Sequence, residues 1–127
     1  MELGFCSFAS GSSGNCYLIK SSEGALLIDA GISTKRIHSS LKDIGVGRDE
    51  VKGLFLTHEH SDHVKAVRVL TKQNPDWEIF ASPGTAEAVA ADVHDPHRMY
   101  MLEAGHQVKV AGMTVRSMRV SHDAADP

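Results

Sequence analysis

The chain has 127 residues, of which 42% are hydrophobic and 23% are charged, as is typical of one globular domain rather than a disordered segment. Its formal net charge is −3 and no run of Lys or Arg exceeds two residues, so the sequence shows no basic stripe and neither indicates nor excludes nucleic acid. The apolar runs are far shorter than the roughly 18 residues of a bilayer span, and no signal-peptide pattern is present, so we expect a cytoplasmic protein that does not contact membranes.

The first part of the chain contains three short apolar runs separated by Gly- and Ser-rich turns, a pattern that predicts strands of a β-meander. These strands are expected at residues 3–9, 16–21 and 25–29. Two of them carry Cys6 and Cys16, which we expect to be reduced and buried because two cysteines are too few for a disulfide framework. Ser33 can then cap a helix that Gly45 terminates. Its buried stripe is expected to consist of Ile37, Leu41 and Ile44.

Beyond Gly45, strand-like and helix-like segments alternate. We expect a strand at 53–56, a helix at 64–72, a strand at 78–82, a helix at 83–92, and a hairpin of two strands at 106–110 and 113–120. The meander and the hairpin are expected to share one sheet whose first face is covered by the helices and whose second face is uncovered.

Three histidines and two acids occur within six positions in the stretch LTHEHSDHV, directly after the apolar strand that ends at Leu56. Alternate side chains of an extended chain point to one side, so His58 and His60 can converge on one metal ion. If the chain then turns into a helix, Asp62 and His63 point elsewhere and can bind a second ion a few ångströms away. The intervening Glu59 and Ser61 have the opposite parity and are expected to be spacers.

His122 follows the alternating strand MTVRSMRV and therefore also lies at the carboxyl end of a strand. Three histidines with an open fourth position form the site with which a catalytic zinc lowers the pKa of bound water to about 7. We therefore expect His122 to complete the set begun by His58 and His60. The remaining histidines are expected to be solvated and to bind no metal. They are His38, on an exposed helix face, and His94, His97 and His106.

The motif residues match the H-x-H-x-D-H signature without departure, and on this match the chain resembles the metallo-β-lactamase superfamily. Within it, the segments FASGSSGNCYLI, LLIDAG and VSHDAADP resemble the YycJ (WalJ) type of metallohydrolase, a branch associated with exonuclease action on DNA. The resemblance implies an α/β (α+β) chain with the αββα sandwich fold and two metal ions at one edge of the sheets.

In the pattern that this resemblance implies, His58, His60 and His122 bind the first metal, while Asp62 and His63 bind the second. Asp29, at the end of LLIDAG, matches a supporting acid behind the motif loop, although it could be a simple acid that ends a strand. Asp62 would also orient a hydroxide that two divalent ions activate for attack on a phosphodiester of DNA or RNA. We expect Zn²⁺, with Mn²⁺ or Fe²⁺ as alternatives.

Two other functions remain open at this point. A small-molecule acyl hydrolase of the glyoxalase II or lactonase kind uses the same metal chemistry, because the choice of a phosphodiester comes from the resemblance alone. The chain could also be a noncatalytic metal-binding fragment. The resemblance implies a bridging aspartate and a final histidine beyond residue 127, so we expect residues 1–127 to form the N-terminal part of a single truncated domain. Such a piece is expected to self-associate through its uncovered sheet face.

Overall fold

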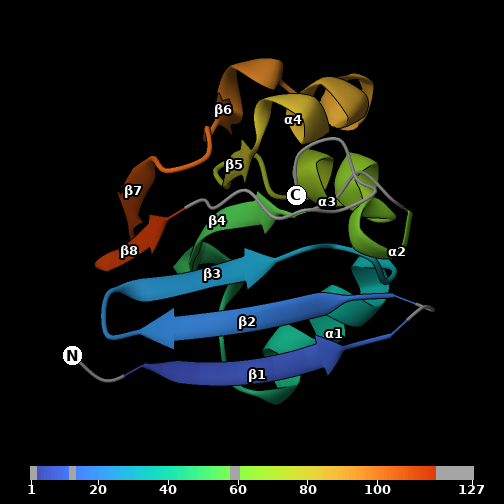
Figure 1. The fold of residues 1–127 in the computed structure, drawn as a ribbon. Coiled ribbons are helices and arrows are strands. Elements are labelled where there is room, and N and C mark those ends of the chain that lie inside the picture. The colour runs from blue at the N-terminus through green and yellow to red at the C-terminus, as the bar shows by residue number, and fades with distance from the viewer. Residues whose placement is uncertain (1–2, 12–13, 58–60, 117–127) are drawn as a thin grey trace.

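The structure, a computed structural model, describes residues 3–11, 14–57 and 61–116. Six strands form one sheet in the order β1-β2-β3-β4-β5-β6 (Figure 1). They are β1 (Gly4–Ala9), β2 (Cys16–Ser21), β3 (Gly24–Ile28), β4 (Val51–Leu56), β5 (Glu78–Ala81) and β6 (Met99–Met101). The predicted meander is confirmed, because β1, β2 and β3 pair consecutively and antiparallel. From β3 onward the pairs are parallel, each joined by a helical connection. The short strand β6 was not predicted.

The helices lie in the connections between strands. They are α1 (Thr34–Asp43), α2 (Ser61–Val64), α3 (Val67–Gln73) and α4 (Pro83–Val89), with short 3₁₀ helices η1 (Arg48–Glu50), η2 (Ala90–Asp92) and η3 (Pro96–Arg98). The predicted cap of α1 is confirmed, since the Ser33 hydroxyl accepts from the Arg36 amide at 3.2 Å. Gly45 has the expected left-handed backbone, with φ of 75°. The expectation that Ile44 is buried is wrong, because it is the residue that caps the helix and is 42% exposed.

The helix predicted at 64–72 is divided into α2 and α3, with the break at Lys65 and Ala66. The Ala66 amide donates to the carbonyl of Ala30 at 2.7 Å, a contact that ties the break to the loop after β3. The helix predicted at 83–92 is α4 followed by η2. It begins as expected, with Pro83 in the first turn after the cap residue Ser82.

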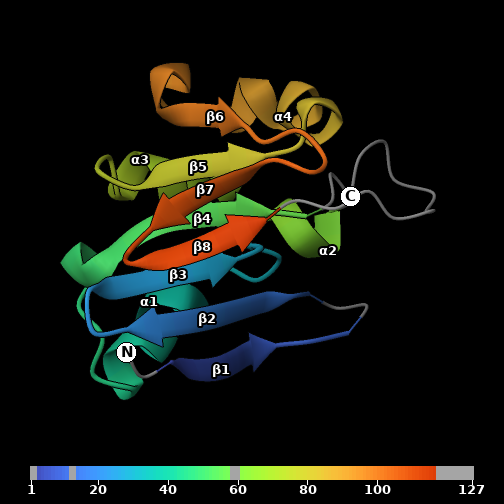
Figure 2. The ribbon, with the colours of Figure 1, turned by 60° about the vertical axis from the view of Figure 1, so that its left-hand side comes forward.

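The helices α1, α3 and α4 cover one face of the sheet, and the hairpin of β7 (Gln107–Val110) and β8 (Met113–Arg116) covers part of the other (Figure 2). Consecutive residues of the central strands therefore face different layers: Leu54 packs in the helix layer and Phe55 packs against the hairpin. The helix-side core is the larger cluster. It contains Leu18, Leu27, Leu54, Ile79, Ile37, Leu41, Val67 and Leu70. Because central strands are buried on both faces, their sequences are continuously apolar rather than alternating.

The expectation that the hairpin shares a sheet with the meander is wrong, since β7 and β8 form a two-stranded sheet of their own. Val110 and Met113 bury themselves against Leu26, Phe55 and Phe80, so the second face of the main sheet is partly covered. The aromatic rings of Phe55 and Phe80 stack with centroids 4.6 Å apart beneath the hairpin. The predicted strand residues 117–120 lie outside the described residues.

The histidines and cysteines away from the motif differ in their environments. The expectation for His38 is wrong: it is half-buried, and its Nε2 lies 3.0 Å from the side-chain amide of Asn74. Burial, together with the positive charge of Arg48, lowers the pKa of His38 below its usual value. His94, His97 and His106 are exposed as expected. Both cysteines are free, Cys16 being buried and Cys6 only half-buried. None of the helices in the described ranges is long and apolar enough to cross a membrane.

Candidate metal centre

The candidate site is built at the edge where the parallel strands β3 and β4 end. Ile28 pairs with Phe55 in the register of these strands, so Asp29 and Thr57 leave the sheet side by side. The Asp29 amide donates to the Phe55 carbonyl at 2.7 Å, which extends the ladder beyond the last paired residues. Functional groups of parallel sheets gather at the carboxyl ends of their strands, and this is the edge from which the HEHSDH segment departs.

The Asp29 carboxylate is the centre of a hydrogen-bonded cluster. It is 2% exposed, and its Oδ1 accepts from the Thr57 amide at 2.7 Å. Its Oδ2 accepts from the Thr57 hydroxyl at 2.6 Å and lies 2.6 Å from Nδ1 of His63. A buried carboxylate requires such donors, because transfer from water without them costs several kcal/mol. Asp29 is therefore held by Thr57, directly after β4, and by His63, the last residue of the motif.

The contact with Asp29 determines the form of the His63 ring. A carboxylate oxygen accepts, so Nδ1 carries the hydrogen and the lone pair of the neutral imidazole resides on Nε2. The His63 side chain is 19% exposed, against 3% for Asp29. This is the arrangement in which a carboxylate orients a histidine for metal binding through the other ring nitrogen.

Backbone contacts join the loops that carry these residues. The Ala30 amide donates to the His63 carbonyl at 2.7 Å, and the Gly31 amide donates to the Asn15 carbonyl at 2.8 Å. Asp29 itself has φ of 65°, a left-handed conformation that turns the chain at the strand end. The loops after β1, β3 and β4 thus form one bonded unit at this edge.

The loop after β1 approaches so closely that only glycine is accommodated at position 14. A Cβ built there would lie 2.5 Å from the Gly31 carbonyl oxygen, and φ of Gly14 is 150°. The Asn15 side chain closes the same loop by donating to the Gly11 carbonyl at 2.9 Å and accepting from the Gly11 amide at 3.2 Å. This glycine- and serine-rich loop is therefore held directly against the segment that follows Asp29.

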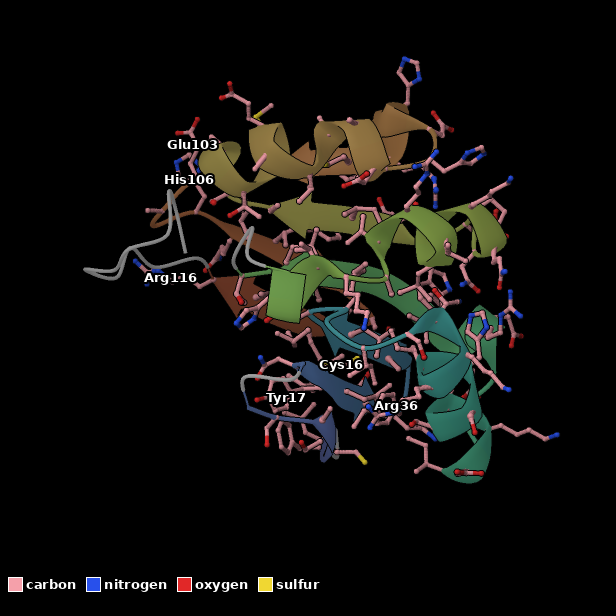
Figure 3. The ribbon with its side chains drawn as sticks, turned by 90° about the vertical axis from the view of Figure 1, so that its right-hand side faces the viewer. Cys16, Tyr17, Arg36, Glu103, His106 and Arg116 are labelled. Carbon is pink, nitrogen blue, oxygen red and sulfur yellow. The ribbon has the colours of Figure 1, made fainter. Side chains whose placement is uncertain are left out.

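Cys16, the first residue of β2, is buried in the core on the helix side of the sheet, and Arg36 of α1 lies near it (Figure 3). Burial raises the pKa of its thiol to about 12, the negative charge of Asp29 adds to the effect, and Arg36 opposes it. At neutral pH the thiol is therefore neutral, and it acts as a small apolar side chain rather than as a metal ligand.

The structure places only part of the predicted ligand set. His63 is described and contacts Asp29, whereas His58, His60 and His122 lie outside the described residues. Asp62 belongs to α2, but its side chain is outside the described part. Among the described residues no three His, Cys, Asp or Glu side chains gather into a metal site. The metal-binding roles of all five residues therefore stay predictions.

Sequence reasoning missed Thr57 and Asn15. Thr57 immediately precedes the first histidine of the motif, and its amide and hydroxyl together hold both oxygens of Asp29. A hydroxyl residue at the end of a buried strand was a usable signal for it. Asn15 carried no signal beyond its place in a turn-rich segment. Its carbonyl accepts from Gly31, which follows a different strand.

A family model described as the metallo-beta-lactamase superfamily matches residues 9–107. The chain belongs to this superfamily, and its sheet with helices on one face represents one βα half of the metallo-β-lactamase fold. Family membership implies divalent metal ions as cofactors.

Two bacterial exodeoxyribonucleases are similar to nearly the whole chain. Exodeoxyribonuclease WalJ of Streptococcus pneumoniae serotype 2 is 34% identical over 132 aligned positions, which cover 99% of this chain and 49% of WalJ. Exodeoxyribonuclease YycJ of Bacillus anthracis is 34% identical over 129 positions, covering 100% of this chain and 48% of YycJ. The chain spans about half the length of the curated relatives it matches.

Solved structures agree on the fold. The subclass B3 metallo-β-lactamase MEM-A1, from a soil metagenome library, superposes with a TM-score of 0.78 at 17% identity, covering 98% of this chain and 52% of MEM-A1. The chemotaxis sensor ODP, described as a peroxy diiron species, superposes with a TM-score of 0.70 at 17% identity, covering 88% of this chain and 47% of ODP. At these identities the likeness concerns the fold alone.

The described residues fit a metal of this family. The Nδ1 of His63 is engaged by a buried carboxylate, which favours the tautomer that ligates through Nε2. The carboxylate is itself held by two donors of Thr57, so its position does not depend on the metal. Imidazole and carboxylate groups suit Zn²⁺, Mn²⁺ and Fe²⁺.

Proposed function

We propose that this chain carries the metal-binding part of a metal-dependent hydrolase that cleaves phosphodiesters at the ends of DNA. The observation that supports this most directly is the Asp29–His63 contact at the end of β3 and β4, immediately beside the H-x-H-x-D-H motif. The names of the two relatives at 34% identity, both exodeoxyribonucleases, support the choice of a DNA substrate. RNA ends remain an alternative substrate for the same chemistry.

In this proposal the predicted ligands are divided between two ions. His58, His60 and His122 hold one ion, and Asp62 and His63 hold the other, Zn²⁺ being the metal we expect in both positions. When bound, the ions activate water and neutralise charge on the phosphate. Water adds to phosphorus as the P–O ester bond breaks, which leaves a phosphate on one product and a hydroxyl on the other.

The protein residues position and hold protons in this scheme. Asp29 keeps the hydrogen of His63 on Nδ1, which would leave the lone pair of Nε2 available to hold a metal ion. Asp62 orients the attacking water as well as binding metal. Thr57 keeps both oxygens of Asp29 in place through its amide and hydroxyl, which limits reorganisation at the site.

The test is hydrolysis of end-labelled DNA by the full-length protein loaded with zinc, with and without chelator. We expect cleavage that the chelator abolishes, and a loss of at least tenfold in rate for Asp62→Asn without loss of the fold. Asp92→Asn, on the exposed surface of η2, is the matched control and should retain the wild-type rate. Rapid hydrolysis of a thioester or lactone with no cleavage of any nucleic acid would instead establish an acyl hydrolase. Metal binding with neither activity would establish a noncatalytic module.

We also propose self-association of residues 1–127 through the part of the sheet that the hairpin leaves open. Phe5 of β1 is 69% exposed and stacks on Tyr17 with ring centroids 5.9 Å apart, beside the half-buried Ile19. Such apolar surface favours association. A monomeric mass for residues 1–127 in solution, at concentrations up to about 100 µM on the scale of weak interfaces, would contradict it.

A nuclease of this kind would meet DNA in the cytoplasm, which is the location we propose.

A further inference from the structure

The exposed face of α3 is strongly basic in a chain that is acidic as a whole. Residues 63–74 contain Lys65, Arg68 and Lys72 but no Asp or Glu, whereas the whole chain has 13 Lys and Arg against 16 Asp and Glu. All three cationic residues are exposed. The charge of this helix therefore differs in sign from that of the protein.

The helical geometry places two of the cations on one face. Arg68 and Lys72 are four residues apart and lie one above the other on α3, and Lys65 lies in the turn before α3, three residues before Arg68. The opposite side of the helix is buried through Val67 and Leu70. From Arg68 to Lys72 the helix rises by about 6 Å, at about 1.5 Å per residue.

This basic face starts at the candidate metal centre. Lys65 is two residues from His63, and the next residue, Ala66, is bonded to the loop that follows Asp29. α3 then runs along the outer surface of the sheet (Figure 3). α3 ends at Gln73, and the side-chain oxygen of the next residue, Asn74, accepts from Arg48 at 2.8 Å. Arg48 belongs to η1, which immediately precedes β4. The three cations thus mark a path from the site toward the opposite edge of the sheet.

Within the part of the chain that the structure describes, no acidic side chain pairs with the cations of this face. In the described ranges, neither of the two ion pairs involves Lys65, Arg68 or Lys72. The loop that touches α3, through the His94 amide and the Thr71 hydroxyl, carries Asp95, which instead contacts His97. An external polyanion would therefore meet three available cations.

Two other arginines in the helix layer show the contrast. The Arg98 guanidinium donates to four backbone carbonyls, those of Asn74, Trp77, Thr71 and His94, at 2.6 to 2.9 Å. Arg48 donates to the Asn74 side chain and to the Gln73 carbonyl. Both are held within the fold, whereas Lys65, Arg68 and Lys72 have no such internal partner among the described residues.

We propose that Lys65, Arg68 and Lys72 bind the phosphate backbone of the DNA strand that leaves the metal centre. About 6 Å of helix between Arg68 and Lys72, preceded by the turn that carries Lys65, matches about three successive phosphates, since one strand of DNA carries a phosphate about every 3.4 Å along its axis. Cations that contact phosphates but no bases contribute affinity and fix the register of the DNA strand, but they do not select its sequence. The proposal rests on the proposed nuclease function and adds a binding surface to it.

The test measures how salt weakens DNA binding. The zinc-loaded full-length protein would be titrated with a fluorescent 30-nucleotide strand over a range of salt concentrations, as would a variant with Lys65→Gln, Arg68→Gln and Lys72→Gln. The logarithm of the binding constant falls as the logarithm of the salt concentration rises, and each lost phosphate contact makes this slope about 0.7 less steep for single strands. The loss of three contacts should therefore reduce the magnitude of the slope by about 2. A matched variant with Lys20→Gln, Lys42→Gln and Lys109→Gln, all exposed and outside α3, should retain most of the wild-type slope.

A second measurement separates this proposal from the proposed function. The ratio of KM for the 30-nucleotide strand to KM for a dinucleotide should rise at least tenfold in the α3 variant, since only the long strand reaches Lys72. DNA hydrolysis with an unchanged salt slope and an unchanged KM ratio would overturn the α3 path and leave the nuclease standing. Absence of DNA hydrolysis in the wild-type protein would overturn the nuclease itself. Circular dichroism of the variant would verify that α3 is retained.

Discussion

The contact between Asp29 and His63 makes a sharp prediction for the substitution Asp29→Asn. The asparagine amide can replace one carboxylate oxygen as the acceptor for the Thr57 amide, but its NH₂ group cannot accept from Nδ1 of His63. The imidazole would then accept at Nδ1 and carry its hydrogen on Nε2, which is the wrong tautomer for metal binding. Asparagine also tolerates the left-handed backbone of this position, φ 65°, so the substitution adds little strain.

The magnitude follows from the contacts that are lost. Removal of a group that orients a metal-binding histidine costs about 10- to 100-fold in metal affinity, or about 1.4 to 2.7 kcal/mol at about 1.36 kcal/mol per tenfold. The 2.6 Å contact is to a carboxylate that is 2% exposed, so the free energy of unfolding should also fall. For one hydrogen bond to a charged group we expect a loss of about 1.5 to 3 kcal/mol.

The assay is competition for zinc against a chromophoric chelator, combined with ¹⁵N spectra that report which nitrogen of His63 carries the hydrogen. The chain offers a matched control in Asp95→Asn. Asp95 also contacts a histidine at Nδ1, His97, and also has a left-handed φ, of 61°. Those side chains are 52% and 98% exposed, so water replaces the lost contact and zinc affinity should be unchanged.

One pair of results would refute this reasoning. If Asp29→Asn bound zinc as tightly as the wild-type protein while its spectra showed the hydrogen moved to Nε2, the tautomer of His63 would be irrelevant to the metal. If the hydrogen remained on Nδ1, Asp29 would not be the group that determines the tautomer.

Three further predictions concern the metal ligands and the core. Replacement of His58 and His60 together by Ala should abolish stoichiometric metal uptake in elemental analysis, and His106→Ala should leave it unaltered; full occupancy of the double variant would disprove the ligand assignment. Burial raises the pKa of the Cys16 thiol to about 12 in the folded protein, whereas in the unfolded protein the thiol ionises near its ordinary value of about 9. Between these values only the unfolded state loses the proton, so the free energy of unfolding should fall as pH rises from about 9 toward 12. Denaturant unfolding at several pH values would detect this slope, and Cys16→Ala should lack it. Gly53→Val should lower the free energy of unfolding, measured by chemical denaturation, by about 1 to 3 kcal/mol through overpacking. A Cβ there lies 3.2 Å from the Phe80 ring of β5 and 3.4 Å from Val110 of the hairpin. Unchanged stability would mean that the hairpin moves away easily.

Local patterns in the sequence predicted most of the elements correctly, because each depends on residues close together in the chain. Turns rich in Gly and Ser separated the strands of the meander, and Ser33 and Gly45 marked the two ends of α1. Boundaries failed where a distant contact intervened. The helix predicted at 64–72 is broken at Ala66, whose amide bonds to Ala30 after a different strand.

The motif could also be predicted from the sequence, since all four of its ligand candidates lie within six positions and their spacing alone indicates metal binding. The supporting acid was found only through the family resemblance. Its actual partners, Thr57 and His63, could not have been paired with Asp29 from spacing, because they are 28 and 34 positions away. They meet because β3 and β4 are parallel neighbours.

Side-chain surroundings were decided by the tertiary structure alone. His38 was expected to be solvated from its place on the helix, yet it is half-buried against Asn74, which follows α3. The hairpin was expected to extend the main sheet, yet it packs across it, where Val110 and Met113 are buried against Phe55 and Phe80.

The distribution of charge shows the same division. Composition and the absence of long Lys or Arg runs argued against a basic stripe, and both observations are correct for the linear chain. A helix brings residues 68 and 72, four apart, onto one face, and folding buries its apolar side. These two cations, together with the exposed Lys65 in the turn before α3, become the basic surface. The sequence alone determined which chemical groups the protein has and which elements carry them. The packing of α3 against the sheet, driven by burial of Val67 and Leu70, decided that these three charges face outward beside the site.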